Sequence, residues 1–309
     1  MAEMGSSGAN VAARGVDAVV VSYRSRETLR ACVAPLCDLD SVNVIVVDND
    51  SPDDTLETIA DLPLDAIRSP RNGGFAYGCN RGAAAGSAPY VLLINPDAEI
   101  SAAAIETLVR ALESDPLLAA VGPCIRGEDG ALKRTQRRFP RLRSTWSQAF
   151  FLHRLAPRAP WTDEVIWDPE AYIRPGAPEW LSGACLLIRR SALEKVGGLD
   201  ERFFLYCEDI DLCRRLRQAG YELRFDPAAT VYHQGGASAP RGSTLPIYAR
   251  SRVLYARKHY GRAARSLEIM GVVAGEATHA VTSMTRPAVF RGHAAAIRAA
   301  LRPAPVPGS

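Results

Sequence analysis

The apolar run Tyr90–Ile94, followed at once by Asn95-Pro96-Asp97, constrains the fold of this chain more than any other feature. A strand without polar alternation is buried on both faces, as in the middle of a sheet that helices cover on both sides. A side chain directly after such a strand lies at the sheet edge where α/β proteins bind their ligands. The segment therefore predicts an α/β fold that carries Asp97 in a site.

Two earlier segments, Asp17–Tyr23 and Asn43–Val47, also have the composition of buried strands. Apolar residues at helical spacing separate the strands, so we expect right-handed βαβ units in a mostly parallel, Rossmann-like sheet flanked by helices. Tyr23, Asp48 and Asp97 then come at strand ends, which makes them candidate site residues. Further elements are predicted at Ala66–Arg68 (strand), Gly73–Gly86 (helix), the segment after Ser101 (helix), Ala184–Arg189 (strand), Glu208–Ala219 (helix), and Glu222–Phe225 and Thr230–Tyr232 (strands).

Asp97 has two interpretations. A hard cation that bridges diphosphate oxygens needs few protein ligands, and one carboxylate with Glu99 nearby suits that role. Alternatively, Asp97 is a turn residue before the helix that Ser101 caps.

Asp48 lies in the sequence Asp-Asn-Asp-Ser-Pro-Asp-Asp, which is also good turn and capping sequence. The functional interpretation is a carboxylate that accepts the N–H of a pyrimidine base, with Tyr23 packed on the face of the base.

Glu208-Asp209-Ile210-Asp211 opens a predicted helix, where acids are favoured by the helix dipole alone. Asp209 is also a candidate general base for removing a proton from a hydroxyl, although the helix end should lower its pKa. His233, after a strand and before two glycines, is either a structural histidine or a ligand of a metal or diphosphate.

The charge of the chain is unevenly distributed. The net charge is +3, yet residues 241–309 hold eleven arginines and lysines against two glutamates, so residues 1–240 are net acidic. A basic C-terminal region suggests contact with anionic lipid or nucleic acid, or simply a solvated helical face. No stretch reaches eighteen uninterrupted apolar residues. We expect a disordered tail at 1–15, one globular domain at 16–240 and a basic helical extension at 241–309.

Two other segments narrow the function. The glycine-rich segment Asn72-Gly73-Gly74-Phe75 matches neither the dinucleotide-binding nor the P-loop signature, which argues against those two classes. Residues 126–177 are rich in Arg, Pro and Trp and weakly periodic, which is typical of long loops in a variable acceptor region.

Taken together, these segments resemble the family 2 glycosyltransferases with the GT-A fold, and among them the bacterial rhamnosyltransferase-like group. The resemblance runs from Val16 to about Ser238, with its segments in the family's order. They are Val-Val-Val-Ser-Tyr (19–23), Val-Asp-Asn-Asp-Ser-Pro-Asp (47–53), Asn-Gly-Gly-Phe-Ala-Tyr-Gly-Cys-Asn (72–80), Leu-Ile-Asn-Pro-Asp (93–97), Trp-Leu-Ser-Gly-Ala (180–184), Gly-Gly-Leu-Asp-Glu-Arg-Phe-Phe (197–204), Glu-Asp-Ile-Asp-Leu (208–212) and His-Gln-Gly-Gly (233–236).

The resemblance implies a role for each candidate residue. Tyr23 and Asp48 would hold the nucleotide base, Asp97 would bind Mg²⁺ or Mn²⁺ on the diphosphate, and His233 would be a second metal ligand. Asp209 would be the catalytic base. The other predicted site residues are Asn49, Asn72, Gly74, Asn80 and Asn95 for the nucleotide sugar, Trp180 and Gly183 on the acceptor side, and Glu208 beside the base.

The family's usual Asp-x-Asp is Asn95-Pro96-Asp97 here, a variant that resembles the rhamnosyltransferase-like group. The resemblance implies an inverting, metal-assisted transfer, with L-rhamnose from dTDP-L-rhamnose as the best guess for the donor. The acceptor would be a glycan or a polyprenyl-diphosphate-linked sugar in cell-envelope polysaccharide synthesis. Alternatives are a UDP-galactosyl or UDP-glucosyl transferase and a non-catalytic sugar-nucleotide-binding protein.

The partners and location follow from the same resemblance and from the basic C-terminal region. We expect a cytoplasmic protein at the inner face of the cell membrane, held there peripherally by residues 241–309. No recognition motif supports nucleic-acid binding. A homodimer is one arrangement that the sequence leaves open.

Overall fold

The predicted strand Tyr90–Ile94 is β4, and all five of its residues are buried in the middle of a sheet. The computed structural model describes residues 15–234 and 241–302, so the predicted tail lies almost wholly outside the described residues. The strand order is β3-β2-β1-β4-β8-β6-β9-β5, with β7 beside β6. The other strands are β1 (Val16–Ser22), β2 (Val42–Asp48), β3 (Asp65–Arg68), β5 (Ala98–Ile100), β6 (Leu118–Arg126), β7 (Leu132–Lys133), β8 (Cys185–Arg189) and β9 (Glu222–His233).

The first half of the sheet is parallel, as predicted, and the second half is mixed. β1 runs parallel to β2 and β4, whereas β8 runs antiparallel to both β4 and β6. Strand direction depends on the connections between strands, which an apolar run such as β8 does not reveal. The sequence suggested two strands where the structure has the single strand β9. The pairing of β9 with β6 is interrupted after Asp226 and resumes at Thr230, which explains the two separate predicted segments.

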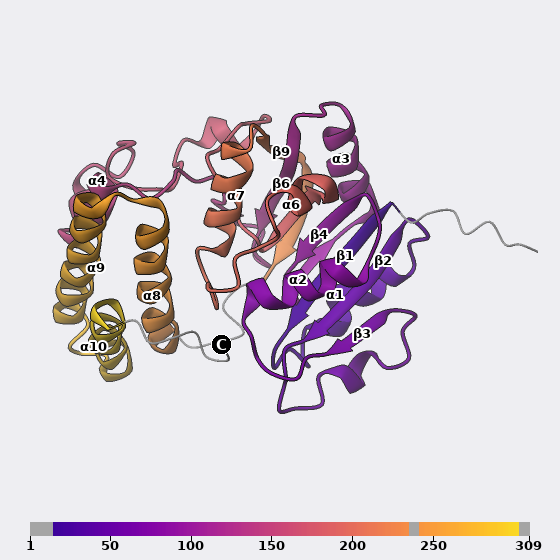
Figure 1. Ribbon diagram of the computed structural model, residues 1–309, viewed down its shortest axis with the longest axis horizontal. Helices are drawn as coiled ribbons and strands as arrows, with labels where there is room; N and C mark the ends of the chain where they lie inside the picture. The colour runs from indigo at the N-terminus through magenta and orange to yellow at the C-terminus, as the bar shows by residue number, and fades with distance from the viewer. Residues whose placement is uncertain (1–14, 235–240, 303–309) are drawn as a thin grey trace, which may run out of the picture.

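Helices cover both faces of the sheet (Figure 1). Ala18 and Val20 of β1 join the core cluster that includes residues of α1 and α3, whereas Val19 and Val21 join the cluster with residues of α2 and α7. This division follows from the alternation of side chains along a strand. The helices are α1 (Leu29–Cys37), α2 (Phe75–Ala85), α3 (Ala102–Glu113), α6 (Arg190–Lys195) and α7 (Glu208–Gln218), with a 3₁₀ turn η1 (Leu56–Ile59).

Residues 126–177 are not only loops, so that part of the prediction was wrong. They contain α4 (Leu142–Ala149), α5 (Leu152–Leu155), a 3₁₀ turn η2 (Pro169–Tyr172) and the short strand β7. The buried positions of α4 are Ser144, Thr145, Ser147 and Ala149. Small and polar residues give no apolar periodicity, which is why the sequence did not predict this helix.

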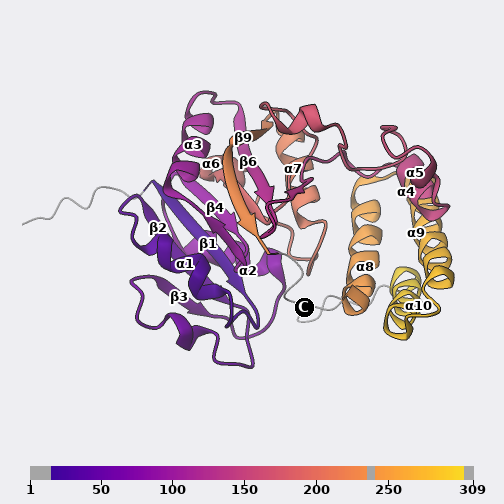
Figure 2. The same cartoon turned by 180° about the vertical axis from the view of Figure 1, so that it is seen from behind.

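The C-terminal region is helical, as predicted, with α8 (Arg241–His259), α9 (Arg262–Thr282) and α10 (Pro287–Leu301). Figures 1 and 2 show these helices with α4 on the far side of α7 from the sheet. Buried Arg252 of α8 binds Glu164 and Glu268, each at 2.6 Å, and so joins α8 to α9 and to the segment after α5. Within residues 15–234 and 241–302, no helix combines the length and the apolar composition needed to cross a bilayer.

Candidate active site

Asn95, Asp97 and His233 meet at the edge of the sheet where β4 ends. β5 pairs with the end of β9 in antiparallel register and places Ala98 opposite His233. The His233 Nε2 atom lies 3.0 Å from Asp97 Oδ1 and 3.3 Å from Asn95 Nδ2. Two segments more than 130 residues apart in the chain thus supply one cluster of polar side chains at this edge of the sheet.

The Nε2 atom of His233 faces both a carboxylate, which accepts a hydrogen bond, and an amide nitrogen, which donates one. One ring nitrogen cannot accept from the amide and donate to the carboxylate at the same time. The Asp97 carboxylate and the lone pair of His233 Nε2 are the two groups that would hold a divalent cation here. The described residues contain no group of three or more His, Cys, Asp or Glu that could hold a metal. A cation here would therefore need diphosphate or water oxygens, as Mg²⁺ commonly does.

Asp209 lies beside the same strand ends. Its Oδ2 accepts a hydrogen bond from the Gly183 N–H at 3.1 Å, and its Oδ1 accepts one from the Ile210 N–H at 2.8 Å. The next residue after Gly183, Ala184, accepts a hydrogen bond from the Asn95 N–H at 2.9 Å. The segment 183–184 therefore joins the cluster of Asn95, Asp97 and His233 to the first turn of α7.

Burial raises the pKa values of both acids in the first turn of α7. The Asp209 carboxylate is stabilised by its two backbone hydrogen bonds, whereas Glu208 is buried, lies next to the Asp209 charge, and has an Oε2 atom without a partner in the described part of the chain. Burial and the adjacent Asp209 charge raise the pKa of Glu208 well above its ordinary value, so a second negative charge beside Asp209 is disfavoured. The helix end was expected to lower the pKa of Asp209, but burial has the larger effect.

The glycine-rich segment Asn72–Phe75 contacts the loop before α7 and the end of β2. Gly74 has a φ of +88°, and a Cβ there would lie 2.1 Å from the Phe204 carbonyl oxygen. The Asn49 Nδ2 group donates to the Gly74 carbonyl at 2.8 Å, and Asn72 Oδ1 accepts from the Gly74 N–H at 3.1 Å. Only glycine fits this conformation and this close contact.

Asp48 is buried at the end of β2, directly opposite Ser22 of β1. Its carboxylate accepts from the Ser22 hydroxyl at 3.2 Å and from the Ser51 N–H at 3.2 Å. Tyr23, the next residue after β1, is 37% exposed and lies under the Arg24 guanidinium. The two predicted base-binding residues therefore lie at the ends of adjacent strands. Ser22 is a third polar residue at this position, which was not among the predicted site residues.

The polar side-chain groups of two predicted site residues, Asn80 and Trp180, form hydrogen bonds to the backbone of the protein itself. The Asn80 side chain binds the loop before α7 through Leu199, to whose carbonyl it donates and from whose N–H it accepts, each at 2.9 Å. The Trp180 indole donates to the Arg138 carbonyl at 2.9 Å. Their predicted roles at the donor and acceptor sides stay predictions.

Arg137 is a further candidate that the sequence argument did not select. Its guanidinium lies 5.8 Å from the centroid of the Trp180 ring, and its charge acts to lower the pKa of Asp209. The sequence shows only that arginines are frequent at 134–143, and this does not indicate which of these arginines lies near Asp209.

Comparisons with known sequences show the family of the chain. The family described as Glycosyl transferase family 2 matches residues 17–197, and the family described as Glycosyl transferase family group 2 matches residues 139–265. The chain is 35% identical over 237 residues to the N-acetylglucosaminyl-diphospho-decaprenol L-rhamnosyltransferase of Mycobacterium tuberculosis, covering 71% of this chain and 76% of that protein. It is 31% identical over 149 residues to rhamnosyltransferase WbbL of Escherichia coli, covering 47% and 52%.

Solved structures share the fold at low sequence identity. One is the mannosyltransferase PcManGT from Pyrobaculum calidifontis in complex with GDP-Man and Mn²⁺, with a TM-score of 0.57 and 15% identity over 93% of this chain and 87% of that one. Another is GalNAc-T7 with UDP, GalNAc and Mn²⁺, with a TM-score of 0.58 and 16% identity over 80% and 51%. The architecture is therefore that of the GT-A glycosyltransferases, as expected from the sequence.

Proposed function

The chain belongs to glycosyltransferase family 2, and on that premise we propose that it transfers L-rhamnose from dTDP-L-rhamnose to a hydroxyl of a polyprenyl-diphosphate-linked sugar or a glycan. The observation that carries the proposal is the link from Asn95 through Ala184 and Gly183 to Asp209. The segment 183–184 thus lies between the candidate metal ligands, next to Asn95, and the candidate base Asp209. The sugar and the acceptor rest on the names of the two rhamnosyltransferases to which the chain is similar.

In the proposed reaction, the acceptor hydroxyl attacks the anomeric carbon as the bond to the nucleoside diphosphate breaks, which inverts that carbon. Asp209 takes the proton of the hydroxyl as the new bond forms. Its raised pKa makes it a better proton acceptor than an exposed aspartate, and its two backbone hydrogen bonds fix its orientation. Burial and the Asp209 charge raise the pKa of Glu208, which disfavours a second negative charge at the site.

Asp97 and His233 would hold Mg²⁺ or Mn²⁺, which when bound stabilises the negative charge of the departing diphosphate. Tyr23 and Asp48 would contact the nucleotide base, with Asn49, Asn72, Gly74 and Asn95 completing the donor site. Asn80 would shape the donor side through the loop at Leu199, and Trp180 and Gly183 would line the acceptor side.

We also propose that the protein acts in the cytoplasm, held peripherally at the inner face of the membrane by its basic helices. A lipid-linked acceptor resides at such a surface, and exposed Arg or Lys near anionic lipid contributes about 1 kcal/mol each to binding. Measurement of the mass in solution would test whether the protein is the homodimer that the sequence leaves open.

The proposal is tested by incubating the purified protein with a panel of nucleotide sugars and a lipid-diphosphate-linked N-acetylglucosamine, with and without Mn²⁺. We expect release of dTDP from dTDP-L-rhamnose, dependent on the acceptor. Turnover of UDP-galactose or UDP-glucose instead would support the alternative of a UDP-hexose transferase.

A further inference from the structure

We propose that a cavity between α4, α7 and the α8–α9 junction binds the phosphate group of an anionic phospholipid. The inference deepens the membrane contact proposed above and rests on it. The cavity has a volume of about 730 Å³ and lies outside the cluster of Asn95, Asp97 and His233. Its lining combines cationic and apolar side chains, which are the two features that a lipid headgroup with its attached chains requires.

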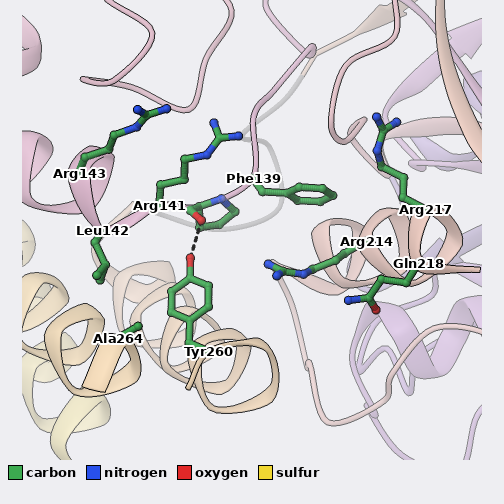
Figure 3. A pocket seen from close by; sticks show the side chains of 10 residues that line it. Phe139, Arg141, Leu142, Arg143, Arg214, Arg217, Gln218, Tyr260 and Ala264 are labelled. Carbon is green, nitrogen blue, oxygen red and sulfur yellow. Dashed lines mark hydrogen bonds between the residues drawn. The ribbon is translucent and has the colours of Figure 1, made fainter. Parts of the chain in front are cut away.

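Arginines from two segments converge on this cavity (Figure 3). Arg141 and Arg143 come from the start of α4, and Arg214 and Arg217 come from the last turns of α7. The lining, as described, contains no Asp or Glu. Four guanidinium groups around one cavity therefore create a positive potential that favours a phosphate.

The four arginines are not equally available to a ligand. Arg141 is paired with Glu179, and Arg214 donates to the Tyr255 hydroxyl at 2.9 Å and lies against the ring of Phe139. Arg143 and Arg217 form no ion pair with any residue that the structure describes. Arg214 has no described counterion either, but its neutral partners Tyr255 and Phe139 hold its side chain in place. Arg143 and Arg217 are therefore the arginines most available to a ligand, and they lie on opposite sides of the cavity lining.

Apolar groups form the rest of the wall. Phe139, Leu142 and Ala264 line the cavity, and the Tyr260 hydroxyl donates to the Pro140 carbonyl and so fixes the wall at the α8–α9 junction. A free inorganic anion would gain nothing from these side chains. A phospholipid would place its glycerol and the first carbons of its chains against them.

The cavity is continuous with an exposed apolar stripe on α9. Ala264 lines the cavity, and Leu267 lies almost one turn further along the same helix. Leu267, Met270 and Val281 are exposed and fall on one face of α9 at helical spacing, with Met284 just beyond its end. Exposed apolar side chains flanked by arginines are typical of a helix that lies in the membrane interface.

The charges of this region favour a membrane over a second copy of the chain. The acids after residue 240 are Glu268, which is buried against Arg252, and Glu276, which is bonded to His293 at 2.7 Å. The remaining ionic groups on these helices are basic, so two copies that meet face to face would repel each other. An anionic bilayer would instead be attracted.

The helix α7, which lines the cavity with Arg214 and Arg217, also carries the proposed base. Asp209 is in the first turn of α7, and Arg217, eight residues later, lies about 12 Å further along the helix. A phospholipid bound here would hold α7 near the bilayer surface, where a lipid-linked acceptor is found. The cavity is therefore placed to position the catalytic domain without contacting the reacting atoms.

The test is sedimentation of the full chain with vesicles, which needs no donor sugar and so does not depend on the transfer reaction. We expect the wild type to bind phosphatidylcholine vesicles containing phosphatidylglycerol and to bind pure phosphatidylcholine at least tenfold more weakly. The double variant R143Q/R217Q should lose at least tenfold in affinity for the anionic vesicles, with its unfolding temperature unchanged. The matched control R257Q/R286Q removes the same charge from exposed positions of the helical region and should lose much less.

Three outcomes overturn the proposal. Equal losses in the two double variants would mean that the basic surface attracts the bilayer without a specific site. Unchanged binding of R143Q/R217Q would exclude the cavity. Recruitment to phosphatidylcholine vesicles by a small fraction of polyprenyl diphosphate, but not by phosphatidylglycerol, would assign the cavity to the lipid acceptor. If the proposed transfer reaction fails but the arginine-dependent binding persists, the phospholipid site stands and the transfer proposal alone is lost.

Discussion

The backbone N–H of Gly183 donates a hydrogen bond to Asp209 Oδ2 at 3.1 Å and so fixes the proposed base against the segment that precedes β8. A Cβ at position 183 would lie 3.3 Å from the Phe75 ring and 3.5 Å from Asp209 Cβ. The glycine thus lets the α7 helix, the glycine-rich segment and the strand ends come together. The orientation of Asp209 is set by backbone groups before any acceptor arrives, which is the pre-organisation that a general base requires.

Replacing Gly74 by alanine should destabilise the fold and weaken donor binding. The left-handed φ of +88° disfavours alanine, and its Cβ would collide with the Phe204 backbone. We expect a loss of about 2–4 kcal/mol, because the positive φ costs about 1 kcal/mol and the collision adds about 1–3 kcal/mol, measured by denaturant unfolding. Gly197→Ala is the matched control, since Gly197 also has a positive φ but open space around its Cβ, and should cost only about 1 kcal/mol. Equal losses would show that the contact with Phe204 has no effect.

Replacing Glu208 by glutamine should stabilise the protein increasingly as the pH rises. The folded-state pKa of Glu208 is raised above its ordinary value of about 4.5, so its contribution to stability is fully present below that pH and is lost as the pH rises toward the folded-state pKa. Glutamine stays neutral at every pH and avoids this loss. The free energies of unfolding of variant and wild type, measured between pH 5 and 9, should diverge by about 1.4 kcal/mol for each unit by which the pKa is raised. Parallel curves would mean that Glu208 ionises normally in the folded protein.

Replacing Arg252 by methionine should strongly destabilise the region formed by α4, α8 and α9. The change leaves Glu164 and Glu268 buried without their cation, and removing one partner from a buried ion pair costs about 3–5 kcal/mol. Thermal unfolding of the variant is compared with that of Arg257→Met, which removes an exposed arginine of the same helix and should change stability little. A small effect of Arg252→Met would show that the ion pairs of Arg252 with Glu164 and Glu268 do not hold these elements together.

Replacing Asp97 by asparagine, or His233 by alanine, should weaken nucleotide diphosphate binding at least tenfold in the presence of Mn²⁺ and change it little without the metal. Isothermal titration calorimetry measures both conditions. Glu99→Gln is the matched control, because Glu99 lies two residues after Asp97 but is exposed on β5. Asp97 would be excluded as a ligand if its variant retained the affinity of the wild type in Mn²⁺.

The sequence predicted the first half of the fold well because its strands are buried on both faces. A continuous apolar run such as β4 indicates a buried strand clearly. The predicted N-cap Ser101 also accepts a hydrogen bond from the Ala104 N–H, at 3.2 Å. The second half of the fold depends less on patterns that can be read from neighbouring residues in the sequence. The antiparallel direction of β8 depends on distant connections, and α4 buries small polar residues against α9 rather than an apolar stripe.

The candidate site divides in a similar way. Polar residues at or shortly after the ends of buried strands, such as Asp48 and Asp97, can be recognised in the sequence because the strands themselves can. Arg137 and the arginine-lined cavity could not be predicted, because they depend on how residues 134–143 pack against α7 and the C-terminal helices. The pKa of Asp209 also depends on burial, which the rule for acids at helix N-termini does not include.

The variant Asp209→Asn tests whether Asp209 removes the acceptor proton beside a separately formed donor site. Single-turnover transfer from dTDP-L-rhamnose to the lipid-linked acceptor should fall by about 10²–10⁴-fold. The affinity for dTDP in Mn²⁺, measured on the same preparation, should stay within about twofold, since asparagine keeps the acceptor for the Gly183 hydrogen bond. Transfer at the wild-type rate by this variant would contradict the account.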